Sequence, residues 1–200
     1  MYLLKLMNYF RMLLLAAILS FSVSINAKVP MVHVYTYGNF DKQKAARYVS
    51  EIRKYYANVK FESKKLVLPI SAFYTPRQRY LAYAVLSSQY RYCPKGDYVV
   101  GITDKDISVF RMVDGQRVNR GIFGLTDRIG GHCCIFSSFR IKHDADMKYL
   151  MLHELGHAFG LQHCTNRCLM QDAHSKNKFG YLRSFCPSCK AVLKSKGWKL

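Results

Sequence analysis

The segment from residue 153 to residue 163 reads HELGHAFGLQH and fixes three histidines in a tight pattern. His153 and His157 are one helical turn apart, so both imidazoles lie on one face of a helix and can bind the same metal ion. Gly160 lets the chain leave the helix in a backbone conformation that bulkier residues disfavour, which brings His163 back to that ion. Three neutral histidines leave one position of a tetrahedral zinc open, as in catalytic zinc sites.

Glu154, next to the first histidine, is the residue that we expect to act as a base. It is close enough to reach a metal-bound water without taking a ligand position, and zinc lowers the pKa of such a water to about 7. A chance HExxH match would instead lie on an ordinary amphipathic helix with a solvated glutamate. Because Gly160 and His163 follow at the offsets of the longer motif, the sequence predicts a catalytic zinc site. A site that binds zinc without turnover is the alternative.

Four cysteines follow the histidines in two close pairs, Cys164 with Cys168 and Cys186 with Cys189. Two such pairs suit a closed tetrahedral zinc site of the structural kind. Disulfides or free thiols are the alternatives, because a CxxC pair alone also marks redox motifs.

The histidine motif followed by these cysteines and Met170 closely resembles the archaemetzincins, a family of metzincin zinc peptidases. Residues 100–107 (VGITDKDI), 123–124 (FG) and 130–131 (GG) resemble the segments that precede the active-site helix in that family. The resemblance implies a zinc-dependent peptidase that hydrolyses peptides or proteins with Glu154 as general base, and it places Met170 in the Met-turn below the metal. It also implies two zinc ions, a catalytic one on His153, His157 and His163 and a structural one on Cys164, Cys168, Cys186 and Cys189.

The alternative function is a non-catalytic, zinc-stabilised binding module for anionic polymers or cell-envelope components. The formal net charge of +19 favours anionic partners. The basic residues are scattered, however, so we expect at most a diffuse attraction to an anionic envelope and no specific nucleic-acid binding. Glu154 favours the peptidase, because a binding module needs no base beside an open zinc. We expect a monomer.

The first 27 residues have the outline of a Sec signal peptide. Lys5 and Arg11, with no acidic residue, accompany an apolar run at residues 12–23, and Ala27 offers a small residue at the cleavage point. The run is shorter than the about 20 residues of a spanning helix, and an uncleaved anchor is the alternative. We therefore expect export to the periplasm or medium, with residues 28–200 forming a single domain.

Three further cysteines, Cys93, Cys133 and Cys134, have no assigned role. Neighbouring residues of a strand point to opposite faces, so Cys133 and Cys134 cannot easily share one partner. In an oxidising compartment Cys93 could pair with one of them, which would leave one thiol.

The apolar pattern indicates an α+β fold. Strands are expected at 31–37, 66–73, 98–103, 107–112 and 133–139, and helices at 41–56, at 75–90 and from Asp146 through the histidine motif. The family resemblance implies a zincin-like metallopeptidase fold, a twisted mixed sheet with backing helices and an active-site helix. Its outer strand, which we place near residues 130–136, would bind an extended peptide. The tail after Cys164 is expected to be short, irregular and clipped by zinc.

Overall fold

The computed structural model describes residues 28–172 and 181–200. The predicted signal peptide at residues 1–27 lies outside the described residues, so export stays a prediction from the sequence. Within the two described ranges, no helix is both long enough and apolar enough to cross a membrane.

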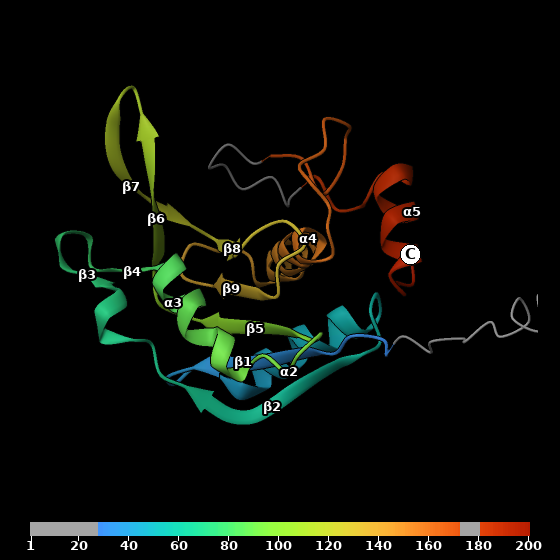
Figure 1. The fold of residues 1–200 in the computed structure, drawn as a ribbon, viewed down its shortest axis with the longest axis horizontal. Coiled ribbons are helices and arrows are strands. Elements are labelled where there is room, and N and C mark those ends of the chain that lie inside the picture. Colours follow the sequence, from blue (N-terminus) through green and yellow to red (C-terminus); the bar gives the residue numbers. More distant parts are fainter. Residues whose placement is uncertain (1–27, 173–180) are drawn as a thin grey trace, which may run out of the picture.

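Two β-sheets make up the strand structure of the described ranges. The larger has the order β2-β1-β5-β9-β8 and is parallel except for β8, which runs antiparallel to β9. The smaller has the order β3-β4-β6-β7, and its β6–β7 hairpin rises beyond β8 (Figure 1). The strands are β1 (Val32–Tyr37), β2 (Val59–Leu66), β3 (Phe73–Tyr74), β4 (Arg79–Leu81), β5 (Tyr98–Thr103), β6 (Ile107–Val113), β7 (Gln116–Ile122), β8 (Gly124–Thr126) and β9 (Cys133–Ser137).

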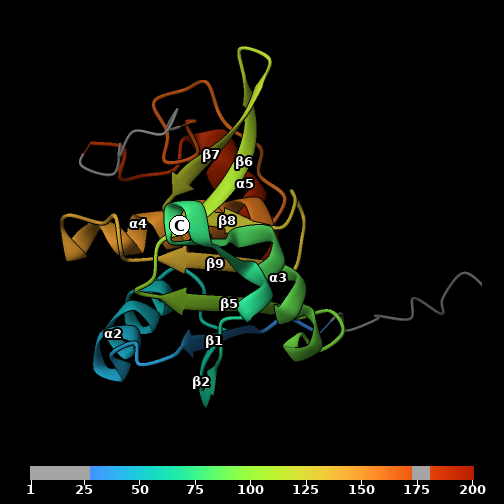
Figure 2. The same ribbon diagram turned by 90° about the vertical axis from the view of Figure 1, so that its left-hand side faces the viewer.

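Helices cover both faces of the larger sheet, with α2 and α4 on one side and α3 on the other (Figure 2). The alternation of side chains along β9 explains the two layers, since Cys134 joins the core under α2 and α4 while Cys133 joins the core under α3. The prediction that these two cysteines face opposite ways is confirmed. The α-helices are α2 (Lys42–Arg53), α3 (Ala82–Gln89), α4 (Met147–Ala158) and α5 (Pro187–Ser195), and the 3₁₀ turns are η1 (Ile70–Ala72), η2 (Thr75–Arg77), η3 (Tyr90–Tyr92) and η4 (Asp144–Asp146).

The predicted strand at 66–73 and the first half of the predicted helix at 75–90 are wrong. Strand β2 ends at Leu66, and Pro69 is followed by a 3₁₀ turn. Thr75 and Pro76 begin a single 3₁₀ turn, which Gln78 ends in a left-handed conformation with a φ of 52°. The chain then pairs as β4 before α3 begins, because strand pairing with Ile107 and Ser108 of β6 overrides the local helical signal.

The predicted outer strand near residues 130–136 is also wrong. Strand β9 begins at Cys133 and has partners on both sides, β5 and β8. The edge of the large sheet next to β9 is β8, a strand of three residues, and β2 is the opposite edge. A segment this short carries too few residues to show an alternating pattern in the sequence.

The tail after Cys164 is more regular than expected, because it contains α5. Pro187 occupies the first helical turn, where its missing N–H costs nothing. Cys189 and Leu193, one turn apart, are buried, and the Trp198 ring lies 5.2 Å from the Phe159 ring, measured between centroids. The tail therefore has an apolar anchor in addition to its cysteines.

Candidate functional site

Helix α4 lies against β8 and β9 and carries the first half of the histidine motif. His153, Glu154 and His157 are all buried. The helix ends at Ala158, and Gly160 adopts a φ of +99°, so the predicted turn at this glycine is confirmed. The N–H of Leu161 then donates to the Gly156 carbonyl at 2.8 Å, which turns the chain back toward the helix.

The turn brings His163 to the other two histidines, and one nitrogen from each ring lies within 4.8 Å of the others. The Nδ1 of His153 is 2.7 Å from the Leu169 carbonyl, and the Nδ1 of His157 is 2.7 Å from the Leu161 carbonyl. A carbonyl only accepts, so each Nδ1 carries the proton and each Nε2 presents a lone pair. Burial lowers the pKa of both rings and so favours these neutral forms.

The two Nε2 atoms of His153 and His157 face each other at 3.1 Å. Two lone pairs at that distance repel unless a cation lies between them. Ligand nitrogens at 2.0–2.1 Å from a tetrahedral zinc are about 3.3 Å apart, close to the observed separation. The donor set and its tautomers therefore fit a zinc ion.

Glu154 lies beside the triad in an almost dry position, with 9% of its surface exposed. Burial raises the pKa of its carboxyl above the ordinary value, which makes the carboxylate a better base. The Thr126 hydroxyl of β8 holds the residue in place, since its oxygen lies 2.7 Å from the Glu154 backbone carbonyl and 3.0 Å from Oε2, and its one proton can be donated to either oxygen. Sequence reasoning missed Thr126, which stands in no recognisable motif.

Met170 packs directly under the active-site helix. A Cβ added to Gly156 would lie 2.6 Å from the Met170 Sδ, so a larger residue at this position would displace the Met170 side chain. The neighbouring Leu169 carbonyl accepts a hydrogen bond from the His153 Nδ1–H, and the Met170 carbonyl accepts one from the Cys164 N–H at 2.9 Å. The segment around Met170 thus connects the histidines to the cysteines.

The four cysteines of the tail converge as a second cluster. One sulfur from each of Cys164, Cys168, Cys186 and Cys189 lies within 4.8 Å of the others, and none forms a disulfide. The Cys164 and Cys186 sulfurs are 3.7 Å apart, against about 3.8 Å for two thiolates on a tetrahedral zinc with 2.3 Å bonds. The backbone N–H groups of Met170 and Cys186 point at the Cys168 sulfur, at 3.4 and 3.2 Å. This donor set fits a closed zinc site.

Comparison with known proteins agrees with this geometry. Residues 117–195 match the model of the family described as Peptidase family M54. An archaemetzincin of Nanoarchaeum equitans is 34% identical over 133 residues, which cover 65% of this chain and 71% of that protein. An archaemetzincin of Methanopyrus kandleri is 29% identical over 157 residues, 74% of this chain and 84% of that protein.

The crystal structure of the Methanopyrus kandleri archaemetzincin superimposes with a TM-score of 0.68 at 25% identity, covering 86% of this chain and 98% of that one. The fold, the histidine triad and the cysteine cluster were all expected from the resemblance, and the expected fold class is confirmed. The chain belongs to the archaemetzincin family of zinc-dependent peptidases.

Proposed function

We propose that His153, His157 and His163 hold the catalytic zinc of this peptidase and that Glu154 is its general base. The observation that carries the proposal is the pair of Nε2 lone pairs that face each other at 3.1 Å, fixed by carbonyl partners on the opposite ring nitrogens. When bound, zinc acts as a Lewis acid on the scissile carbonyl and lowers the pKa of water to about 7. Peptides are the substrates of such an enzyme.

Glu154 then performs the proton transfers. Its carboxylate accepts a proton from the attacking water and returns it to the leaving amine, so one residue is base and acid in turn. Its burial supports this assignment, because the dry surroundings raise the carboxyl pKa toward the working pH. Thr126 keeps the carboxylate oriented through the bond to Oε2.

Strand β8 is the edge at which we place an extended substrate. Among the described strands it pairs only with β9, so its outer backbone groups are available to a peptide strand. Gly124 lies against the active-site helix, where an added Cβ would be 3.1 Å from the Glu154 Cγ. A peptide paired to this edge would therefore pass directly over the base. Main-chain pairing gives affinity with little sequence preference, so specificity must come from side-chain contacts.

The four-cysteine cluster is proposed to hold a second, structural zinc. The hydrogen bond between the Cys186 sulfur and the Ser188 hydroxyl, at 3.1 Å, lowers the pKa of Cys186 to about 5 and so favours its thiolate. A thiolate is the form that binds metal.

We expect the purified protein to contain two zinc ions per chain, with the histidine site losing its ion first to a chelator. His163 is half exposed, with 50% of its side chain accessible, whereas three of the four cysteines are buried. Elemental analysis during stepwise treatment with a chelator measures both the count and the order. One zinc per chain together with disulfides among Cys164, Cys168, Cys186 and Cys189 would contradict the structural site.

Thr126→Val is expected to lower kcat about 10- to 100-fold and leave KM nearly unchanged. The substitution keeps the size of the side chain and removes one hydrogen bond to a charged group, a loss of about 1.5–3 kcal/mol. Because Thr126 acts through Glu154, Thr126→Ser should restore most of the rate. A Thr126→Ser protein as slow as Thr126→Val would show that the hydroxyl does not position the base.

A further inference from the structure

We infer that Arg111 determines substrate specificity by binding a carboxylate of the peptide, either an acidic side chain or the C-terminal carboxylate. The inference rests on the peptidase function proposed above and adds a specificity contact to it. Arg111 is not part of the histidine motif or the cysteine cluster, and it lies more than forty residues before them.

Strand β6 explains how Arg111 comes to the active site. Ile107 and Val109 alternate along the strand and are buried in the core under α3. Arg111 is the next residue on that face and lies beyond the core, where it is exposed. The β6–β7 hairpin rises next to the edge strand β8 (Figure 1), and Arg111 lines cavities that also contain the catalytic residues.

Arg111 lines two cavities that both contain catalytic residues and that together form the active-site cleft. One, of about 110 Å³, also contains Leu150, Glu154 and His163. The other, of about 270 Å³, also contains Glu154, His163 and His157. A peptide that crosses the triad therefore passes within reach of the guanidinium whichever cavity takes its side chains.

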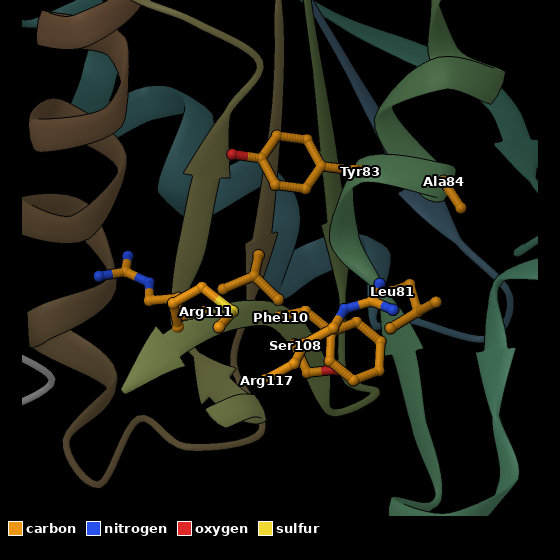
Figure 3. Close-up of a pocket in the computed structure, with 9 residues that line it drawn as sticks. Leu81, Tyr83, Ala84, Ser108, Phe110, Arg111 and Arg117 are labelled. Atoms are coloured by element: carbon orange, nitrogen blue, oxygen red, sulfur yellow. The ribbon is translucent and has the colours of Figure 1, made fainter. Parts of the chain in front are cut away.

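Arg111 also lines a third cavity, a groove of about 460 Å³ between α3 and the β6–β7 hairpin. Figure 3 shows the Arg111 guanidinium directed out of this groove and the Tyr83 hydroxyl directed to the same side, and both residues line the cleft as well. The groove wall is mostly apolar, with Leu81, Ala84 and Met112.

The other arginine at the cleft is already engaged, which singles out Arg111. Arg128 lies 3.2 Å from the Asp127 carboxylate and 3.2 Å from the Tyr90 hydroxyl. Within the described residues, no hydrogen bond or ion pair engages the Arg111 side chain. The cleft acid Asp172 lies 3.9 Å from the His163 Nδ1. A guanidinium without a partner at the edge of a catalytic cleft is suited to a bidentate carboxylate from the substrate.

The test uses quenched fluorogenic peptides of one neutral sequence that the wild type cleaves. Glutamate is placed at each position around the scissile bond, with glutamine at the same position as the matched peptide, and every peptide is made with a free and an amidated C-terminus. We expect one carboxylate position to raise kcat/KM about 10- to 100-fold over its neutral partner. A preference for glutamate identifies a side chain as the source, and a preference for the free terminus identifies the C-terminal carboxylate.

Arg111→Gln should abolish this preference, measured as the ratio of kcat/KM between each carboxylate peptide and its neutral partner. Arg111→Lys should retain part of the preference, because lysine keeps the charge without the planar fork. Arg120→Gln is the matched control, an exposed arginine on the neighbouring strand β7 that lines none of the three cavities. It should behave as the wild type.

Two results would overturn the inference: a wild type without any carboxylate preference, or a preference that survives in Arg111→Gln. Both require cleavage of the neutral peptide, so they leave the peptidase function intact. A wild type that cleaves no peptide of the set would instead contradict the function on which the inference rests.

Discussion

Glu154→Ala is expected to retain its zinc and to lose peptide hydrolysis by at least about 10²- to 10⁴-fold, the usual contribution of a positioned acid–base group. The proposed zinc ligands are one nitrogen from each of the three histidines, and the Glu154 carboxylate is not one of them. Its removal therefore leaves all three ligands in place. Zinc content by elemental analysis and kcat/KM on a fluorogenic peptide are the two measurements. A variant that keeps its zinc but loses activity shows that Glu154 takes part in the reaction and is not needed to hold the metal.

Two comparisons sharpen this experiment. Glu154→Gln keeps the volume and removes the basic oxygen, so it should be as inactive as Glu154→Ala. His163→Ala should lose both zinc affinity and activity, because it removes a ligand. A Glu154→Gln protein that cleaves peptides at the wild-type rate would reject the assignment of the base. Tight retention on an anionic polymer, equal in wild type and Glu154→Gln and without any cleavage, would favour the binding-module alternative.

The part of the site that is local in sequence could be predicted from the sequence. Helical spacing alone is enough to place His153 and His157 on one face. The turn at Gly160 requires only a residue without a Cβ, as its φ of +99° shows. Both depend on neighbours a few residues away. The same holds for Asp41, whose side chain accepts the Lys44 N–H at 2.8 Å and caps α2 at the predicted start of the helix.

The parts that depend on distant pairing could not be predicted in this way. Thr126 reaches Glu154 only because β8 pairs with β9 and lies on α4, and neither contact has a local signal. Arg111 reaches the cleft only because β6 continues past the buried core. The first half of the expected helix at 75–90 is absent for the same reason, since strand pairing with β6 outweighs local preference.

The histidine triad and the cysteine cluster are connected through the segment between them. Cys164 directly follows His163, and its N–H donates to the Met170 carbonyl. The Leu169 carbonyl in turn accepts a hydrogen bond from the His153 Nδ1–H, and the Leu169 N–H donates to the Ser184 carbonyl at 2.7 Å. The cysteine cluster therefore fixes both ends of the loop that orients two of the three histidines. Loss of the cluster should affect stability first and activity as a consequence.

Cys186→Ser is expected to lower the melting temperature of the protein by at least about 10 °C. Binding of a structural zinc contributes directly to folding, and loss of such a site is among the few single changes that cost more than about 4 kcal/mol. In a domain of this size 1 kcal/mol corresponds to about 2–4 °C. Apolar anchors such as Leu193 and Trp198 remain, so the tail should loosen without the whole domain unfolding at room temperature.

Cys93→Ser is the matched control for this experiment. Cys93 lies outside the cluster, and its thiol donates to the Asp97 carbonyl at 3.2 Å, a bond that serine can replace. It should melt within a few degrees of the wild type, as should Glu154→Gln, whereas Cys186→Ser should retain about one zinc per chain. Calorimetry with and without a chelator separates the effects, because the chelator should lower the melting temperature of the wild type toward that of Cys186→Ser. If Cys186→Ser and Cys93→Ser melt together, with two zinc ions still bound to each, the cysteine cluster does not hold the tail in the way that the geometry of its sulfurs implies.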